Sequence, residues 1–246
     1  MMRGATRTFA VAVTAVLAAA ACAVAAPDSA TPVRLACYPA QFGSWHAQTR
    51  TLADKLSFAR DATSVSIGAP QTVCVTASGS SSGYITCYGA KSRTTPEATY
   101  NVTDEFAKSL IVTAQALGSV CLSSTRADQA GSASAPASKS LLSCYTARAS
   151  VPARSGVAVS DAFGTSKDSL GALDGFCSPA GWKSPVADGS FLTCYADQTA
   201  TTGTVVVLQN EFGYLKAALG PRGWLCTSAS FTGGSGAMQP YSRASR

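Results

Sequence analysis

Acid–base chemistry would need a proton acceptor, and the chain offers few of them. His46 is its only histidine, so a nucleophilic site of the Ser-His-Asp or Cys-His kind has no other imidazole to use. A pair of carboxylates that cleaves a glycosidic bond is the alternative, and Glu105 and Glu211 occupy matching positions in an internal repeat. We expect His46 to be a loop residue and the two glutamates to be exposed strand or turn residues.

Cysteine is the reactive residue that recurs most regularly. The chain has nine cysteines, and eight remain once Cys22, which lies near the N-terminus, is set aside. An even number of cysteines in an exported chain is typical of a disulfide framework. Zinc sites use paired ligands such as Cys-x-x-Cys together with histidine. No Cys-x-x-Cys occurs in the sequence, so we expect no metal and no other cofactor.

The spacing of the eight cysteines predicts how they pair. Each of four repeats has an opening cysteine followed by tyrosine, and a second cysteine preceded by an apolar residue. The two are 37, 34, 33 and 32 residues apart within repeats, whereas the steps from a second cysteine to the next opening one are 13, 23 and 17. The rival scheme uses these uneven steps and closes Cys226 onto Cys37. We predict the near-constant set: Cys37 with Cys74, Cys87 with Cys121, Cys144 with Cys177, and Cys194 with Cys226.

A third motif lies between the two cysteines, in which Asp or Asn is followed two residues later by Leu or Phe. Its polar residue shares a strand face with apolar neighbours, and an unpaired buried carboxylate costs several kcal/mol. We therefore expect the strand to end or bulge there, with the side chain accepting hydrogen bonds from nearby backbone N–H groups in an Asx-type turn. One carboxylate per repeat is too few for calcium, which takes about six to eight oxygens. These turn residues are Asp54, Asp104, Asp161 and Asn210.

The opening strands alternate with a period of two, which places the cysteines on one face and the tyrosines on the other. We expect the cysteines to point inward. We expect the aromatic side chains opposite them to pack between repeats, and a face for binding a sugar or a peptide is the alternative. The four tyrosines are Tyr38, Tyr88, Tyr145 and Tyr195.

This repeat pattern resembles that of a family of uncharacterised secreted bacterial repeat domains. Those domains have a Cys-Tyr start, a Val-x-Asp-x-Phe-Gly middle and a Leu-Cys end. The resemblance covers roughly residues 33 to 230. Glycine follows the aromatic residue only at Gly164 and Gly213, whereas Ala107 and Ser57 replace it in the earlier copies. The resemblance implies no known activity.

The first 26 residues are typical of a secretory signal peptide, because Arg3 and Arg7 precede an apolar run that ends in small residues. The run is shorter than the roughly 20 residues of a spanning helix, so we predict no transmembrane helix. Cleavage near Ala25 or Ala26 would release a secreted protein. The alternative is a lipoprotein anchored at the cell surface through Cys22.

The patterns predict an all-β fold of four tandem, disulfide-stapled repeats of about 50 residues each. Each repeat should contain an opening strand, a middle strand and a short third strand that ends at the second cysteine. The longest connection is rich in Ser, Ala, Gly and Pro and is typical of a linker. We therefore predict two halves, each a pair of repeats, and a disordered tail: residues 33–124, linker 125–139, residues 140–230 and tail 231–246.

The charge distribution excludes one class of partner. Removal of the signal peptide lowers the formal charge from +6 to +4, since 17 basic and 13 acidic residues remain. The basic residues are scattered, so no stripe exists that could follow a phosphate backbone, and we expect no nucleic-acid partner. The predicted function is an exported, non-catalytic binding or structural module whose partner is an extracellular protein or a glycan. The alternatives are a secreted hydrolase, using His46 or a carboxylate pair, and a secreted inhibitor of another protein.

Overall fold

The computed structural model describes residues 32–56, 62–77, 83–92, 98–128, 140–184, 186, 189–197 and 204–234. The chain divides into two units, residues 1–31 and residues 32–246, and the fold is that of the second unit. The predicted signal peptide, with Cys22, lies outside the described residues. The described part of the chain contains no apolar helix of membrane-spanning length.

The predicted all-β class is confirmed, because the described residues form thirteen strands. Segments 104–117 and 212–219 contain no helix and consist of bends, turns and strands. The strands are β1 (Arg34–Phe42), β2 (Gln48–Asp54), β3 (Thr63–Thr76), β4 (Tyr84–Ser92), β5 (Ala98–Thr103), β6 (Leu110–Arg126), β7 (Leu141–Arg148), β8 (Arg154–Asp161), β9 (Gly164–Trp182), β10 (Phe191–Asp197), β11 (Val205–Asn210), β12 (Gly213–Leu219) and β13 (Trp224–Gly234).

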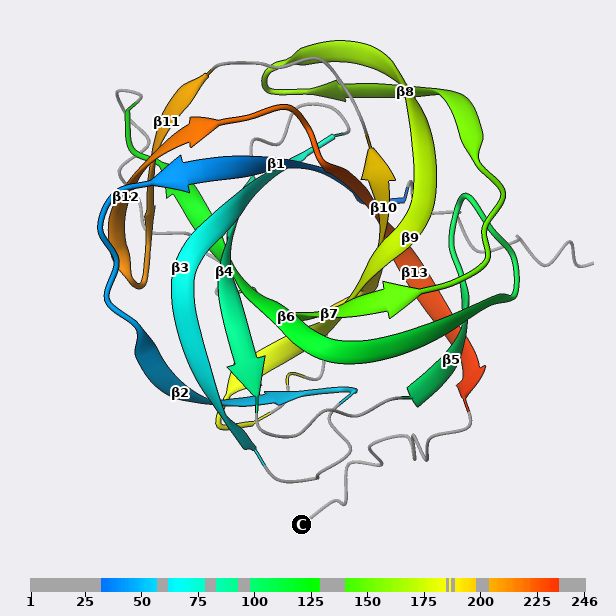
Figure 1. Cartoon of the computed structure of the whole chain (residues 1–246), viewed down its shortest axis with the longest axis horizontal. Coiled ribbons are helices and arrows are strands. Elements are labelled where there is room, and N and C mark those ends of the chain that lie inside the picture. Colours follow the sequence, from blue (N-terminus) through cyan, green and yellow to red (C-terminus); the bar gives the residue numbers. More distant parts are fainter. Residues whose placement is uncertain are drawn as a thin grey trace, which may run out of the picture. The chain divides into compact units, whose positions relative to one another are not determined.

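Eight of these strands close into an antiparallel barrel (Figure 1). In ring order they are β1, β3, β4, β6, β7, β9, β10 and β13, and β13 pairs again with β1. The strands that carry the Cys-Tyr pairs therefore alternate around the ring with the long strands that carry the second cysteines. Closure removes the free edges that an open sheet would expose.

The long strands correct the prediction of a short third strand. β6 has 17 residues and β9 has 19. The first part of β6 forms a hairpin with β5, and the remainder enters the barrel beside β4 and β7 after register shifts between Ala114 and Ser119. Such bulges bend a strand. One strand can therefore serve both an outer hairpin and the barrel, which the spacing of the cysteines does not reveal.

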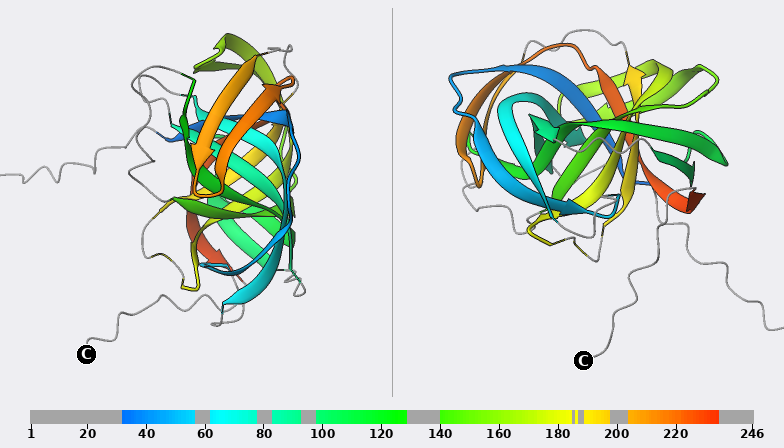
Figure 2. Two further views of the ribbon diagram at one scale, coloured as in Figure 1. Left: turned by 90° about the vertical axis from the view of Figure 1, so that its left-hand side faces the viewer. Right: turned by 60° about the horizontal axis from the view of Figure 1, so that its bottom comes forward.

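The middle strands β2, β5, β8 and β11 form hairpins outside the barrel. Figure 2 shows this for the orange β11–β12 hairpin, which lies against the outer surface of the ring. The main apolar core lies between these hairpins and the barrel, and includes Tyr88, Phe176 and Leu225. A second, smaller core of cysteines and aliphatic residues lies inside the barrel.

The predicted halves do not form separate units. Residues 32–246 are one compact unit, and β6 and β7 pair across the boundary between the halves as barrel neighbours. Residues 125 and 126 of the predicted linker belong to β6, and the linker beyond residue 128 lies outside the described residues. β13 continues to residue 234, so the predicted tail began too early, and residues 235–246 are not described.

Candidate ligand site in the barrel lumen

The four disulfides form one layer inside the barrel, and their pairing is the predicted one. Each opening cysteine lies directly opposite its partner in the strand register. The Cα atoms of the pairs are 3.9 to 4.0 Å apart, which fits the close spacing of opposed antiparallel residues. The pairs are Cys37 with Cys74, Cys87 with Cys121, Cys144 with Cys177, and Cys194 with Cys226.

Two pairs of neighbouring disulfides also contact each other along the wall. The Sγ atoms of Cys37 and Cys226 are 3.8 Å apart, and those of Cys121 and Cys144 are 3.6 Å apart. The inward residues two positions before the opening cysteines add an aliphatic layer to the sulfur layer. They are Leu35, Ile85, Leu142 and Leu192.

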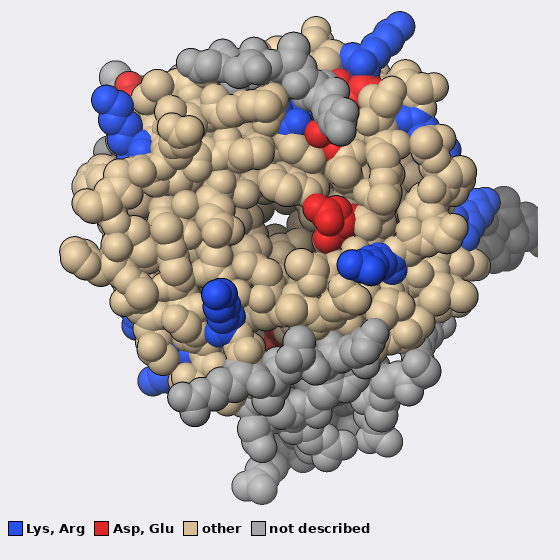
Figure 3. Space-filling view, viewed as in Figure 1, with Lys and Arg blue, Asp and Glu red and all other residues tan. Residues whose placement is uncertain are grey.

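These layers surround a cavity of about 340 Å³. Viewed along the barrel, the surface is hollowed at its centre, with acidic atoms at the rim (Figure 3). The wall is mainly sulfur and aliphatic carbon, with a few polar side chains such as Gln71 and Thr72. Asp174 is the one acidic residue in the lining, and its Oδ2 accepts a hydrogen bond of 2.8 Å from Nε1 of Trp224.

The chemistry of this lumen suits binding. An eight-stranded barrel has an interior that is either filled by side chains or just wide enough for one small ligand. Cystine is short, so four disulfides leave the centre of the barrel open where leucine or phenylalanine would fill it. The cavity lies at the lower end of the range of roughly 300 to 1,000 Å³ that is usual for small-molecule sites.

The repeat tyrosines lie on the opposite side of the barrel wall, where they pack between repeats and form no exposed binding face. All four side chains are buried, with exposed fractions of 0 to 7%. Each hydroxyl instead meets the Asp or Asn of the repeat two places away, an arrangement we call a clasp. The clasp distances are 2.5 Å for Tyr38 and Asp161, 2.9 Å for Tyr88 and Asn210, 2.6 Å for Tyr145 and Asp54, and 2.5 Å for Tyr195 and Asp104.

The Asp and Asn residues also cap turns, as predicted. In each repeat Oδ1 accepts a hydrogen bond from the backbone N–H two residues later, at distances of 2.7 to 2.9 Å. The middle strand ends at this residue or just before it. Each of these side chains therefore stabilises its own turn through Oδ1 and contacts a distant tyrosine through its other terminal atom. That atom is Oδ2 in the three aspartates and Nδ2 in Asn210.

Burial keeps the clasp tyrosines protonated. Desolvation is the largest cause that raises the pKa of all four, and a hydrogen-bonded aspartate raises the pKa further in Tyr38, Tyr145 and Tyr195. A neutral hydroxyl can donate a hydrogen bond to a carboxylate, so the direction of these shifts fits the geometry.

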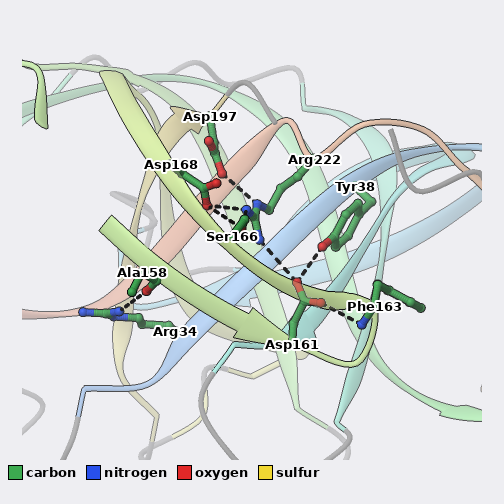
Figure 4. Close-up of polar contacts among 9 residues, drawn as sticks. All are labelled: Arg34, Tyr38, Ala158, Asp161, Phe163, Ser166, Asp168, Asp197 and Arg222. Atoms are coloured by element: carbon green, nitrogen blue, oxygen red, sulfur yellow. Dashed lines mark hydrogen bonds and ion pairs between the residues drawn. The ribbon is translucent and has the colours of Figure 1, made fainter. Parts of the chain in front are cut away.

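One clasp is extended by a buried arginine (Figure 4). In three repeats a Thr or Ser precedes the opening cysteine, and Thr193, for example, donates to Oδ2 of Asp104 at 2.6 Å. The first repeat has Ala36 at this position. There Arg222 donates from Nη1 to Asp161 at 3.3 Å and from Nε to Asp197 at 2.7 Å. Nη2 of the same guanidinium contacts Asp168, and all of these charged side chains are at most 4% exposed.

The three residues considered for catalysis lie in different surroundings. His46 is exposed in the connection between β1 and β2. Glu105 is partly buried, contrary to expectation, because Arg34 clamps both of its oxygens at 2.6 to 2.9 Å. Glu211 is exposed and accepts a hydrogen bond of 2.6 Å from Nε1 of Trp182. The two glutamates thus have different partners.

Two features escaped the sequence reasoning. The Arg222 cluster combines Asp161 with two aspartates that lie outside the repeat motifs, and its one visible sign was Ala36 in place of the Ser or Thr of the other repeats. The pair of Trp224 and Asp174 gave no signal, because it depends on the register between β9, β10 and β13.

Comparisons with known proteins add no relative: no protein-family model matches the chain, and no curated protein or solved structure shows significant similarity to it.

Proposed function

We propose that the protein is an exported, non-catalytic binding module that holds a small, largely apolar molecule in the lumen of its barrel. The observation that carries the proposal is the cavity of about 340 Å³ with its wall of disulfides and aliphatic side chains. Each disulfide joins directly opposed residues of two neighbouring strands, so the wall is cross-linked within each of these four strand pairs. A preformed site avoids the cost of ordering the protein when the ligand binds.

The polar residues of the lining suggest the orientation of a bound ligand. Asp174 is the one acidic group of the lining, and Trp224 holds one of its oxygens in place. An apolar body in the disulfide layer and a cationic or hydrogen-bond-donating head near Asp174 would satisfy both regions. Disulfides are typical of oxidising compartments, which supports a role outside the cytoplasm, either as a secreted protein or anchored at the cell surface.

The proposal is tested by calorimetric titration of the purified protein with straight-chain amines, alcohols and sulfates of six to twelve carbons. Ser119 lines the lumen, and its Oγ lies 3.8 Å from Sγ of Cys121. We expect Ser119→Leu to weaken binding at least tenfold by filling the lumen, and Ser119→Ala to leave it within about twofold. Asp174→Asn should reduce the preference for amines over alcohols. The proposal would be overturned if none of these series showed saturable binding, or if Ser119→Leu and Ser119→Ala bound with equal affinity.

The non-catalytic part of the proposal has its own test. The protein is screened against ester, peptide and glycan substrates beside a His46→Ala variant, since His46 is the only imidazole in the chain. Turnover that is lost in His46→Ala would instead establish the secreted hydrolase.

A further inference from the structure

The four middle strands differ in how many neighbours they have. Among the described residues, β2 pairs with β3 and β9, β5 pairs with β6 and β13, and β11 pairs with β12 and β6. β8 pairs with β9 alone in the same part of the chain. One edge of β8 therefore lacks the described strand partner that the other three middle strands have.

The lack of a second described neighbour for β8 coincides with one short connection between repeats. β2, β5 and β11 each have an outer neighbour that is the end of a long strand from the repeat two places away. The paired residues of that long strand lie a few positions beyond its second cysteine. The corresponding strand for β8 is β3, which ends at Thr76, and a hydrogen bond of 3.2 Å from the Thr76 N–H to the Gly83 carbonyl turns the chain back into β4. This is the shortest connection between repeats, 13 residues from Cys74 to Cys87.

A groove of about 530 Å³ lies where this outer neighbour would be expected. It is lined by residues 154–158 of β8 and, opposite them, by Arg34, Glu105 and Phe106. The carbonyl of Ala158 points to this side, because it accepts a hydrogen bond of 3.1 Å from Nη1 of Arg34 (Figure 4). Main-chain groups alternate in direction along an antiparallel strand, so the N–H and C=O of Ser160 face the same edge. Both residues are exposed.

The groove carries a positive charge. Arg34 and Arg154 line it together with a single carboxylate, that of Glu105, which is already bound by Arg34. Arg154 is exposed, and its guanidinium donates to the carbonyl of Phe106. The groove therefore has a net charge of one positive unit, which favours an acidic side chain on a strand that binds there.

We propose that the edge of β8 without a described strand partner binds an extended segment of a partner protein, which adds a strand antiparallel or parallel to β8 and places an aspartate or glutamate beside Arg154. Addition of a strand to an exposed sheet edge is a common mode of peptide recognition, in which main-chain hydrogen bonds give affinity and side-chain pockets give specificity. The bulge at Gly156, where φ is 75°, restricts regular pairing to the residues from Val157 to Ser160.

Charge favours a partner over the chain's own C-terminal segment. Residues 235–246 contain Arg243 and Arg246, no acidic residue, and Pro240, so they would bring like charge to the groove and a residue that cannot donate a main-chain hydrogen bond. A second copy of the protein would set one positive groove against another.

The test uses the full chain and three ten-residue peptides of alternating valine and a second residue: glutamate, serine or lysine. Binding is measured by calorimetry, and amide hydrogen exchange reports on Ala158 and Ser160. We expect the glutamate peptide to bind best and to slow exchange at both amides. Ala158→Pro removes the outward N–H and should weaken binding at least tenfold, whereas the matched control Ala158→Val keeps the N–H and should change affinity less than threefold.

A charge reversal keeps the proposal testable if Ala158→Pro fails to fold. Arg154→Glu should invert the preference in favour of the lysine peptide, and Arg148→Glu, an exposed change of equal charge on β7, should not. Equal affinity of Ala158→Pro and Ala158→Val, or binding of no peptide, would overturn the proposal. Binding seen only after deletion of residues 235–246 would identify the tail as the occupant, and a dimer abolished by Ala158→Pro would identify a second copy; either result also overturns it.

Discussion

Tyr38 and Asp161 lie 123 residues apart in the chain, and the hydroxyl of Tyr38 donates a 2.5 Å hydrogen bond to Oδ2 of Asp161. The aromatic ring of Phe163, two residues after the aspartate, packs edge-on against Tyr38 with a centroid distance of 5.2 Å and an interplanar angle of 89°. The same geometry recurs between Tyr88 and Phe212, at 5.1 Å and 88°. Each outer hairpin is thereby fixed to a barrel strand of a repeat two places away.

Removal of one clasp hydroxyl should destabilise the fold. Tyr38→Phe leaves Oδ2 of Asp161 without its tyrosine donor in a buried site, and a hydrogen bond to a charged group contributes about 1.5 to 3 kcal/mol. We expect the free energy of unfolding, measured by urea denaturation, to fall by that amount. Tyr214→Phe is the control, since Tyr214 is 69% exposed and should change stability by less than about 0.5 kcal/mol. Equal effects of the two variants would contradict the structural role of the clasp.

The turn-capping role of Asp161 predicts different costs for two substitutions. Asp161→Asn keeps an oxygen for the Phe163 N–H, as Asn210 does for Phe212 in the fourth repeat. Asp161→Ala leaves that N–H without its acceptor, and we expect it to be less stable than Asp161→Asn by about 1 to 2 kcal/mol in urea denaturation. Melting curves with added calcium provide the check on the alternative. A calcium-dependent melting temperature that disappears in Asp161→Asn would show a metal site instead.

The sequence was a good guide to features that repeat and a poor guide to contacts between repeats. The near-constant cysteine spacing predicted all four disulfides, and the buried Asp or Asn at the end of a strand predicted the turns. Both depend on residues within one repeat. The strand alternation also placed the tyrosines opposite the cysteines, which is where they lie.

The partners of the tyrosines depend on the next level of structure. Alternation shows that Tyr38 and Cys37 face opposite ways, but it does not show which face is covered. The hairpin that covers Tyr38 comes from the third repeat, 123 residues later. The Arg222 cluster is non-local in the same way, because its aspartates belong to β8, β9 and β10. A single sequence contains no periodicity that could have joined them.

Arg222 should be one of the residues most sensitive to substitution. Arg222→Leu leaves Asp161, Asp168 and Asp197 together without their cation at sites that are at most 1% exposed. Loss of one partner of a buried ion pair costs about 3 to 5 kcal/mol, and we expect a loss of at least that size in urea denaturation. Arg148→Leu, at an exposed position, should change stability little. Addition of Asp168→Asn and Asp197→Asn to Arg222→Leu should restore part of the loss, and an absence of any such rescue would contradict the charge argument.

Alkaline pH should weaken the fold through the buried tyrosines. Burial raises the pKa of Tyr38, Tyr88, Tyr100, Tyr145 and Tyr195 above the ordinary value of 10.0. Above that pH the unfolded chain releases protons that the folded protein retains, so the stabilisation is complete below pH 10 and declines as the pH rises. Each tyrosine contributes a slope of about 1.4 kcal/mol per pH unit. Urea denaturation between pH 8 and 11.5 measures the slope, and Tyr38→Phe should make it shallower by one proton. A stability independent of pH above 10 would contradict the assignment.

The contact between neighbouring disulfides predicts a thiol exchange. Cys177→Ala leaves Cys144 as a free thiol, and its Sγ lies 3.6 Å from Sγ of Cys121 in the bond between Cys87 and Cys121. Attack by the Cys144 thiolate forms a bond between Cys121 and Cys144 and releases Cys87 as a thiolate that takes up a proton. The number of disulfides is unchanged, so the exchange needs no oxidant.

Incubation of Cys177→Ala at about pH 8.5, near the ordinary pKa of a thiol, followed by alkylation and peptide mapping without reduction, should therefore reveal label on both Cys87 and Cys144. Cys144→Ala is the matched control. It frees Cys177, for which the described residues provide no second sulfur contact, so the label should remain on Cys177 alone. If the label in Cys177→Ala were confined to Cys144, the Cys144 thiol would not exchange with the bond between Cys87 and Cys121. Exchange would show that the disulfides of the second and third repeats are close enough to react with each other.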